Sequence, residues 1–138
     1  PSMLCVEDYL DALQWADGIG LENLYKKSLA NLKVVEDWVV RTTWIDFLAT
    51  SKEIRSNTSV CLSVVSEKVK ALSKDDQAKF LKGISSELSK RGVAHDINSY
   101  KDAPPGYRFW CGPTIEEASI KNALEELEKV YNEKIKTL

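Results

Sequence analysis

A single arginine lies among aromatic residues in the stretch Tyr-Arg-Phe-Trp at residues 107–110. This short apolar stretch is typical of a strand, and a proline-rich loop at 103–106 precedes it. The planar guanidinium of Arg108 matches the two oxygens of a carboxylate, so this side chain is suited to binding an acidic ligand. It also suits a structural ion pair, with Asp102 or Glu116 as the partner, and the residues alone favour that ion pair.

A second arginine precedes the clearest strand of the chain, in Arg-Ser-Asn-Thr at residues 55–58. Polar side chains at such positions bond backbone groups of a turn. Arg55 or Asn57 could instead reach a ligand. The favoured interpretation is that these side chains bond the backbone of the turn and that the arginine is exposed.

The thiols and the one histidine offer a different chemistry. His95 could act as an acid or base, paired with Cys61 or Cys111 as the nucleophile of a thiol enzyme. No recognisable pattern links these residues, and small cysteines in strands usually serve packing. With one histidine and three widely spaced cysteines, the chain indicates neither a metal site nor a disulfide framework.

The composition limits the partners. The chain has 138 residues, which suits one domain, and its 19 basic and 21 acidic residues are mixed along it, giving a net charge of −2. This balance disfavours nucleic acid as a partner. No apolar run approaches the ~20 residues that cross a membrane, so no membrane partner is expected. The unpaired cysteines fit a reducing cytoplasm.

Apolar spacing and breakers predict the elements that must position these side chains. Apolar residues recur at helical spacing from Val6 until Gly18 and Gly20 break the pattern. The spacing resumes from Leu21 to Val39 and predicts a second helix there, with Asn31 on its solvent side. Further helices are expected at 75–91 and from a Thr114–Glu117 capping box to Tyr131. Short strands are expected at 44–49, 59–65, 93–97 and 107–111.

The resulting order, ααββαββα, predicts an α/β fold. We expect a two-layer sandwich in which a sheet of roughly four strands carries helices on one face. Neither side of the strand at 59–65 is charged, so we expect it to be covered on both faces.

Three segments together resemble a known family. They are PSMLCVEDYLDAL at 1–13, RSNTSVCL at 55–62 and DAPPGYRFWCG at 102–112. In this order and spacing they resemble the C-terminal part of phosphoserine aminotransferases, pyridoxal-phosphate enzymes of the class V group. The resemblance implies that residues 1–20 form a helix connecting to a missing cofactor domain, and that residues 21–138 form the small domain.

The resemblance also implies an activity and roles for residues. Such enzymes are usually homodimers, and they exchange an amino group between glutamate and the phosphorylated 2-oxo acid 3-phosphohydroxypyruvate in serine synthesis. Arg108 matches the arginine that binds the substrate α-carboxylate. Lys101 stands near a basic residue that contacts the substrate phosphate, although the family more often has arginine there. Arg55, with Asn57 beside it, matches a motif that supports the site structurally.

The cofactor chemistry is expected outside this chain. The resemblance places the Schiff-base lysine, the aspartate at the pyridine nitrogen and the phosphate-binding loop before Pro1. We therefore expect no catalytic residue in this chain, no bound pyridoxal phosphate and no activity alone, and an exposed apolar surface that favours self-association. The alternatives are a free-standing α/β ligand-binding or interaction module, in which Arg108 receives an acidic ligand, and the thiol enzyme.

Overall fold

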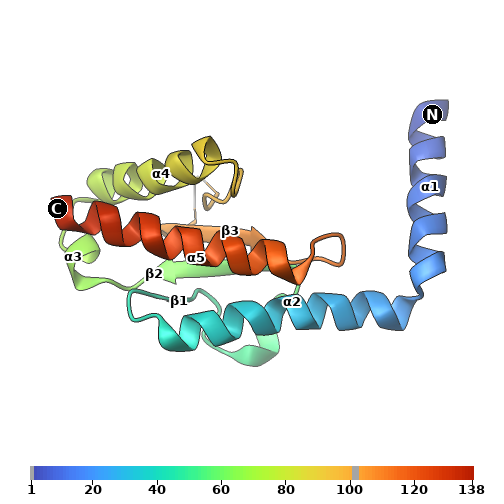
Figure 1. Ribbon diagram of the computed structural model, residues 1–138, viewed down its shortest axis with the longest axis horizontal. Coiled ribbons are helices and arrows are strands. Elements are labelled where there is room, and N and C mark those ends of the chain that lie inside the picture. Colours follow the sequence, from blue (N-terminus) through green and yellow to red (C-terminus); the bar gives the residue numbers. More distant parts are fainter. Residues whose placement is uncertain (1, 101–102) are drawn as a thin grey trace.

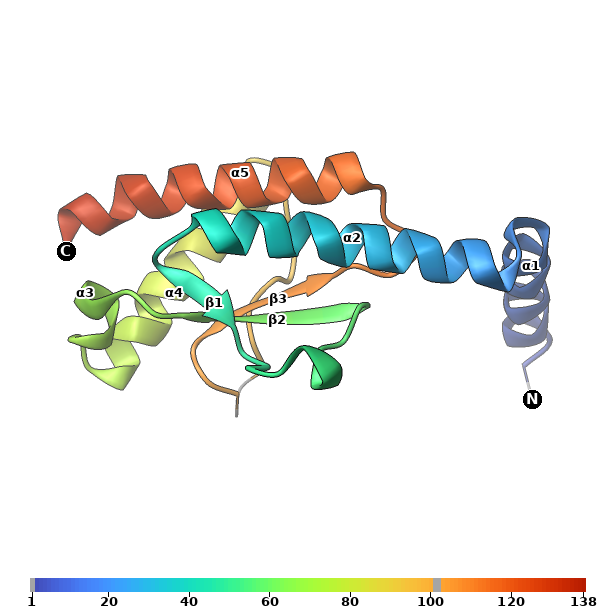
Figure 2. The ribbon, with the colours of Figure 1, turned by 90° about the horizontal axis from the view of Figure 1, so that it is seen from below.

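The computed structural model describes residues 2–100 and 103–138 and is a mixed α/β domain (Figure 1). Its sheet is antiparallel, with the order β1-β2-β3. The predicted two-layer arrangement is confirmed, since helices α2 and α5 lie side by side over one face of the sheet (Figure 2). The strand bounds are Ile45–Phe47 for β1, Ser59–Val64 for β2 and Gly106–Trp110 for β3.

The helices follow the apolar spacing closely. Helix α4 lies beside α5, on the side away from α2 (Figure 1), and the Ser73 side chain caps it by accepting a hydrogen bond from the backbone N–H of Asp76. Short 3₁₀ turns occur at Lys52–Ile54 and Ile135–Thr137. The helix bounds are Met3–Ile19 for α1, Leu21–Arg41 for α2, Glu67–Lys70 for α3, Lys74–Lys90 for α4 and Glu117–Lys134 for α5.

The expected fourth strand is absent from the described residues. The segment at 93–97 leaves the extended conformation at Asp96, whose φ of 51° is left-handed. Only one isolated bridge, between Asn98 and Tyr107, continues the sheet beyond β3. The expectation of four strands was therefore wrong, because a left-handed residue cannot continue a strand.

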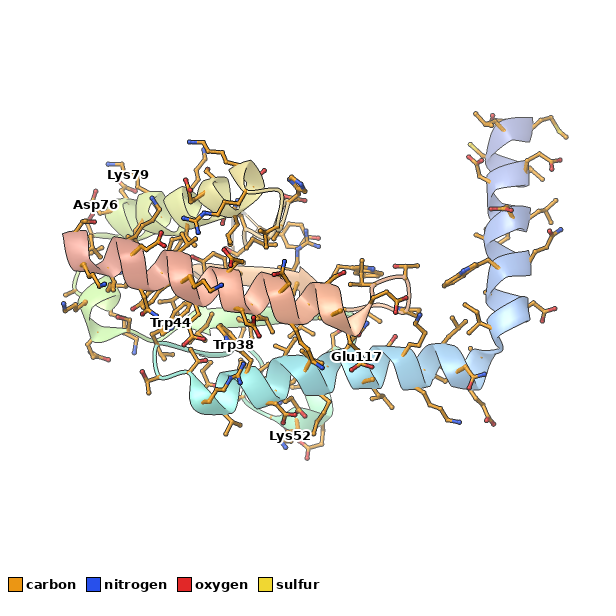
Figure 3. The ribbon with its side chains drawn as sticks, in the orientation of Figure 1. Trp38, Trp44, Lys52, Asp76, Lys79 and Glu117 are labelled. Atoms are coloured by element: carbon orange, nitrogen blue, oxygen red, sulfur yellow. The ribbon has the colours of Figure 1, made fainter. Side chains whose placement is uncertain are left out.

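The core lies between the sheet and the helices. Trp38, Trp44 and Tyr131 form an aromatic cluster within it, and Figure 3 labels the two tryptophans below α5. The Trp44 and Tyr131 rings are stacked with their centroids 3.7 Å apart, and Trp38 meets Trp44 edge-on at 5.9 Å. This cluster joins α2, the start of β1 and α5, so it fixes the helix layer to the sheet.

Asn31 is buried, which overturns the prediction that it faces solvent. Its side-chain amide lies under the turn that follows β3, where Nδ2 is within hydrogen-bond distance of the carbonyl oxygens of Cys111, Gly112 and Ile115, at 3.1, 3.2 and 2.9 Å. The predicted capping box is also wrong, because α5 begins at Glu117 and no side chain caps it. The Asn31 amide thus fixes the turn between β3 and α5.

Helix α1 stands away from the domain (Figures 1 and 2). It meets α2 at Gly20, whose φ of 85° suits glycine and lets the chain turn sharply between the two helices. None of the residues of α1 is buried, and Leu21 and Tyr25 at the start of α2 are exposed as well, contrary to the buried stripe predicted there.

No helix among the described residues has the length and apolar character needed to cross a bilayer.

Candidate functional site

One face of the sheet carries the residues singled out from the sequence. On β2, Val60, Leu62 and Val64 point into the core, so the alternate residues point to the opposite face. We call this the open face, and its residues are half-buried or exposed: Ser59, Cys61, Ser63, Arg108 and Trp110. The expectation that both sides of this strand are buried was therefore wrong.

Arg108 lies on the open face, directly opposite Cys61 in the β2–β3 register. Its side chain is 22% exposed, and its Nε is buried without a hydrogen-bond partner. Among the described residues, the carboxylate paired with it is that of Asp96, with Oδ2 3.7 Å from Nη2, which is too long for a hydrogen bond. The guanidinium therefore keeps N–H donors that a ligand carboxylate can use.

Of the two ion-pair partners suggested by the sequence, the described one, Glu116, does not pair with Arg108. Glu116 pairs with Lys27 at 3.0 Å, and Asp102 lies outside the described residues. The segment that faces Arg108 is instead the one leading from α4 to the loop before β3. From this segment come Asp96 and Tyr100, whose ring centroid lies 4.6 Å from the Arg108 Cζ. Sequence reasoning missed both residues, because no spacing rule connects them to Arg108.

Arg55 differs from Arg108 in its surroundings. It is only 10% exposed, and its Nη1 donates to Glu36 at 2.8 Å. Its Cζ lies 3.6 Å from the centre of the Phe47 ring. These contacts attach the loop before β2 to α2 and β1. Asn57, in the same loop, is half-buried. Like that of Arg108, the Arg55 Nε is buried without a hydrogen-bond partner among the described residues. The close ion pair with Glu36 nevertheless matches its charge, as expected for a structural arginine.

The thiol alternative finds little support. Cys111 is fully buried, and burial raises the pKa of its thiol from 9.0 to about 12, so it is protonated at neutral pH and a poor nucleophile. His95 is exposed, and its Nδ1 lies 2.9 Å from the Ser89 hydroxyl of α4. Cys61 faces Arg108 across the sheet rather than a base.

A cavity of about 810 Å³ lies between α4 and the loop that precedes β3. Tyr100 lines it, and the charged side chains among its described lining residues are those of Lys74 and Lys82. These two lysines favour an anion in the cavity. Lys101, the predicted phosphate contact, lies outside the described residues.

Neither a metal site nor a Schiff-base site is built from the described residues. Across 2–100 and 103–138, no group of His, Cys, Asp and Glu side chains has the arrangement of a metal site. Every lysine in these ranges is exposed or half-exposed. A Schiff-base lysine needs an enclosed apolar setting that lowers its pKa, so these lysines do not fit pyridoxal phosphate.

Comparison with known proteins finds relatives of this chain. No protein-family model matches the chain. The chain is 44% identical over 133 residues to the phosphoserine aminotransferase of Methanosarcina barkeri and 43% identical over 133 residues to that of Methanosarcina mazei. Each match covers 96% of this chain but 33% of the relative, so the chain spans about a third of the relatives' length. The predicted resemblance is confirmed: this chain is similar to part of these phosphoserine aminotransferases.

Proposed function

We propose that this chain is the C-terminal domain of a phosphoserine transaminase and that Arg108 binds the α-carboxylate of the substrate. The reaction converts glutamate and 3-phosphohydroxypyruvate to 2-oxoglutarate and phosphoserine in serine biosynthesis. One observation carries the assignment of Arg108. Among the described residues, its guanidinium, which lies on the open face, has a buried Nε without a hydrogen-bond partner and only a loose contact to an exposed carboxylate.

The electrostatics of Arg108 suit this role. A guanidinium binds a carboxylate through two parallel N–H···O bonds, which fixes both position and orientation of the ligand. The strand backbone holds Arg108 in place, because its N–H donates to the Ile97 carbonyl at 2.8 Å and β3 pairs with β2. A rigid strand presents a binding group more reproducibly than a loop does.

We infer that the exposed helix α1 is covered by the missing part of the protein. The helix stands away from the domain (Figure 3), and many of its large apolar side chains are exposed. A large exposed apolar surface of this kind normally marks a contact with another part of a protein. This supports the division into a connecting helix at 1–20 and a small domain at 21–138. The exposed apolar residues are Met3, Leu4, Val6, Tyr9, Leu10, Leu13 and Trp15.

The cofactor belongs to the missing part in this proposal. Pyridoxal phosphate supplies the electron sink for amino-group transfer when it is bound. The described lysines of this chain do not fit it, so we propose that the cofactor-binding residues precede Pro1. The chain alone is then inactive, and the longer protein works as a cytoplasmic homodimer.

The test is substitution of Arg108 in the longer, cofactor-loaded protein. Arg108→Ala should lower kcat/KM for 3-phosphohydroxypyruvate and for glutamate by about 30- to 1000-fold, as expected for loss of a buried charged contact worth ~2–4 kcal/mol. Arg108→Lys keeps the charge but not the fork, and should recover only part of this loss. Arg41→Ala, at the exposed end of α2, is the matched control. An Arg108→Ala effect below tenfold would refute the carboxylate role.

A further inference from the structure

We propose that Asp96 and Tyr100 govern ligand access to Arg108: the Asp96 carboxylate takes the place of the ligand's carboxylate at rest, and the Tyr100 ring fixes the plane of the guanidinium. This inference rests on the proposed function, because it assumes that Arg108 binds a carboxylate. It adds two residues to that site and gives each a separate, measurable effect.

Asp96 has the properties of a displaceable counterion. Its side chain is 90% exposed, and Oδ2 stays 3.7 Å from the Arg108 Nη2, without a hydrogen bond between them. Exposed ion pairs of this kind contribute little free energy. A substrate carboxylate is the same chemical group and can form the close, bidentate contact that Asp96 does not form. Asp96 therefore competes weakly with the ligand.

The surrounding backbone keeps Asp96 near Arg108. The neighbouring Ile97 carbonyl accepts a hydrogen bond from the Arg108 N–H at 2.8 Å. One residue further, the Asn98 side chain lies 2.6 Å from the Ser85 hydroxyl of α4. The segment is thus attached to both β3 and α4, and the left-handed backbone at Asp96 lies directly before these attachments.

The Arg108 guanidinium carbon lies over the face of the Tyr100 ring. Its ring centroid is 4.6 Å from the Arg108 Cζ, within the range of a cation–π contact. The ring is 68% exposed, so core burial does not explain its position. This contact restricts movement of the guanidinium, while its N–H donors stay available to a carboxylate. Loss of the ring should therefore weaken ligand binding.

The experiment measures KM and kcat of the longer, cofactor-loaded protein with glutamate and with 3-phosphohydroxypyruvate. Asp96→Asn suits the left-handed backbone and removes only the charge. It should lower KM about 2- to 5-fold with kcat unchanged, and this gain should shrink at high salt, because exposed charges are screened. Tyr100→Leu should raise KM about 2- to 5-fold, and Tyr100→Phe should restore it, since the ring face is retained.

Two comparisons separate this inference from the proposed function. Asp75→Asn, an exposed aspartate of α4, controls for the change in net charge. In an Arg108→Ala background, Asp96→Asn should no longer lower KM. If Arg108→Ala alone leaves KM and kcat unchanged, the proposed function fails. If Arg108→Ala has its large effect but Asp96→Asn and Tyr100→Leu behave like Asp75→Asn, this inference fails and the proposed function stands.

Discussion

Replacing Asn31 with leucine should destabilise the domain strongly, although sequence reasoning placed this residue in solvent. The side chain is 1% exposed, and its two amide N–H groups face the carbonyls of Cys111, Gly112 and Ile115. The Gly112 carbonyl also accepts a hydrogen bond from the Ile115 N–H, so it still has a partner when the Asn31 amide is removed. A net hydrogen bond contributes about 1 kcal/mol, and a buried group left without a partner costs ~1–3 kcal/mol. We therefore expect a loss of about 2–4 kcal/mol.

Urea denaturation of the chain, followed by far-UV circular dichroism, measures this loss. Asn31→Leu has similar volume, so its effect reports the missing donors rather than a cavity. Asn122→Leu, at an exposed position of α5, should change the free energy of unfolding by no more than about 0.5 kcal/mol. A loss below 1 kcal/mol for Asn31→Leu, or one equal to that of the control, would refute the account of the turn after β3.

Two further predictions concern stability. A Cβ on Gly106 would lie 1.9 Å from the Leu62 carbonyl oxygen, so Gly106→Ala should cost at least about 2 kcal/mol of stability. Gly83→Ala, in open space within α4, should instead stabilise the domain by about 0.5–1 kcal/mol. Equal urea midpoints for the two variants would contradict this prediction. Burial raises the pKa of the Cys111 thiol from 9.0 to about 12, so the thiol of the unfolded chain loses its proton at a lower pH than the thiol of the folded chain. The free energy of unfolding should therefore fall as pH rises above about 9, by up to about 1.4 kcal/mol per pH unit. Unfolding curves between pH 8 and about 10 check this, and an equal slope in Cys111→Ala would refute it.

Periodic patterns predicted the elements well. Helix α4 was expected at 75–91 and is found at Lys74–Lys90. The strand that carries Arg108 was also predicted, from a short apolar stretch after a proline-rich loop, and is found at Gly106–Trp110. These features depend on neighbouring residues in the sequence, which a periodic pattern records.

The failures depend on contacts between distant residues. Asn31 is polar, and its burial follows from carbonyls about eighty residues later in the chain. The segment at 93–97 has the composition of a strand, but the left-handed Asp96 and the attachment of Asn98 to α4 prevent pairing. Tertiary hydrogen bonds thus overrode local propensity at these positions.

The candidate site shows the same division. The sequence identified Arg55 and Arg108 as arginines that precede or lie in strands. It could not show which of the two keeps N–H donors free for a ligand. The structure separates them, because Arg55 has a 2.8 Å ion pair with Glu36 and Arg108 has only the 3.7 Å contact with Asp96. Partner distance, rather than residue type, therefore distinguishes the two arginines.

Amino-group transfer itself tests the central claim most directly. The measurement is formation of phosphoserine from glutamate and 3-phosphohydroxypyruvate, by the longer cofactor-loaded protein and by residues 1–138 alone at equal concentration. Our account predicts turnover by the longer protein and none by residues 1–138 with added pyridoxal phosphate. Absence of turnover by the longer protein, or turnover by residues 1–138 alone, would contradict it.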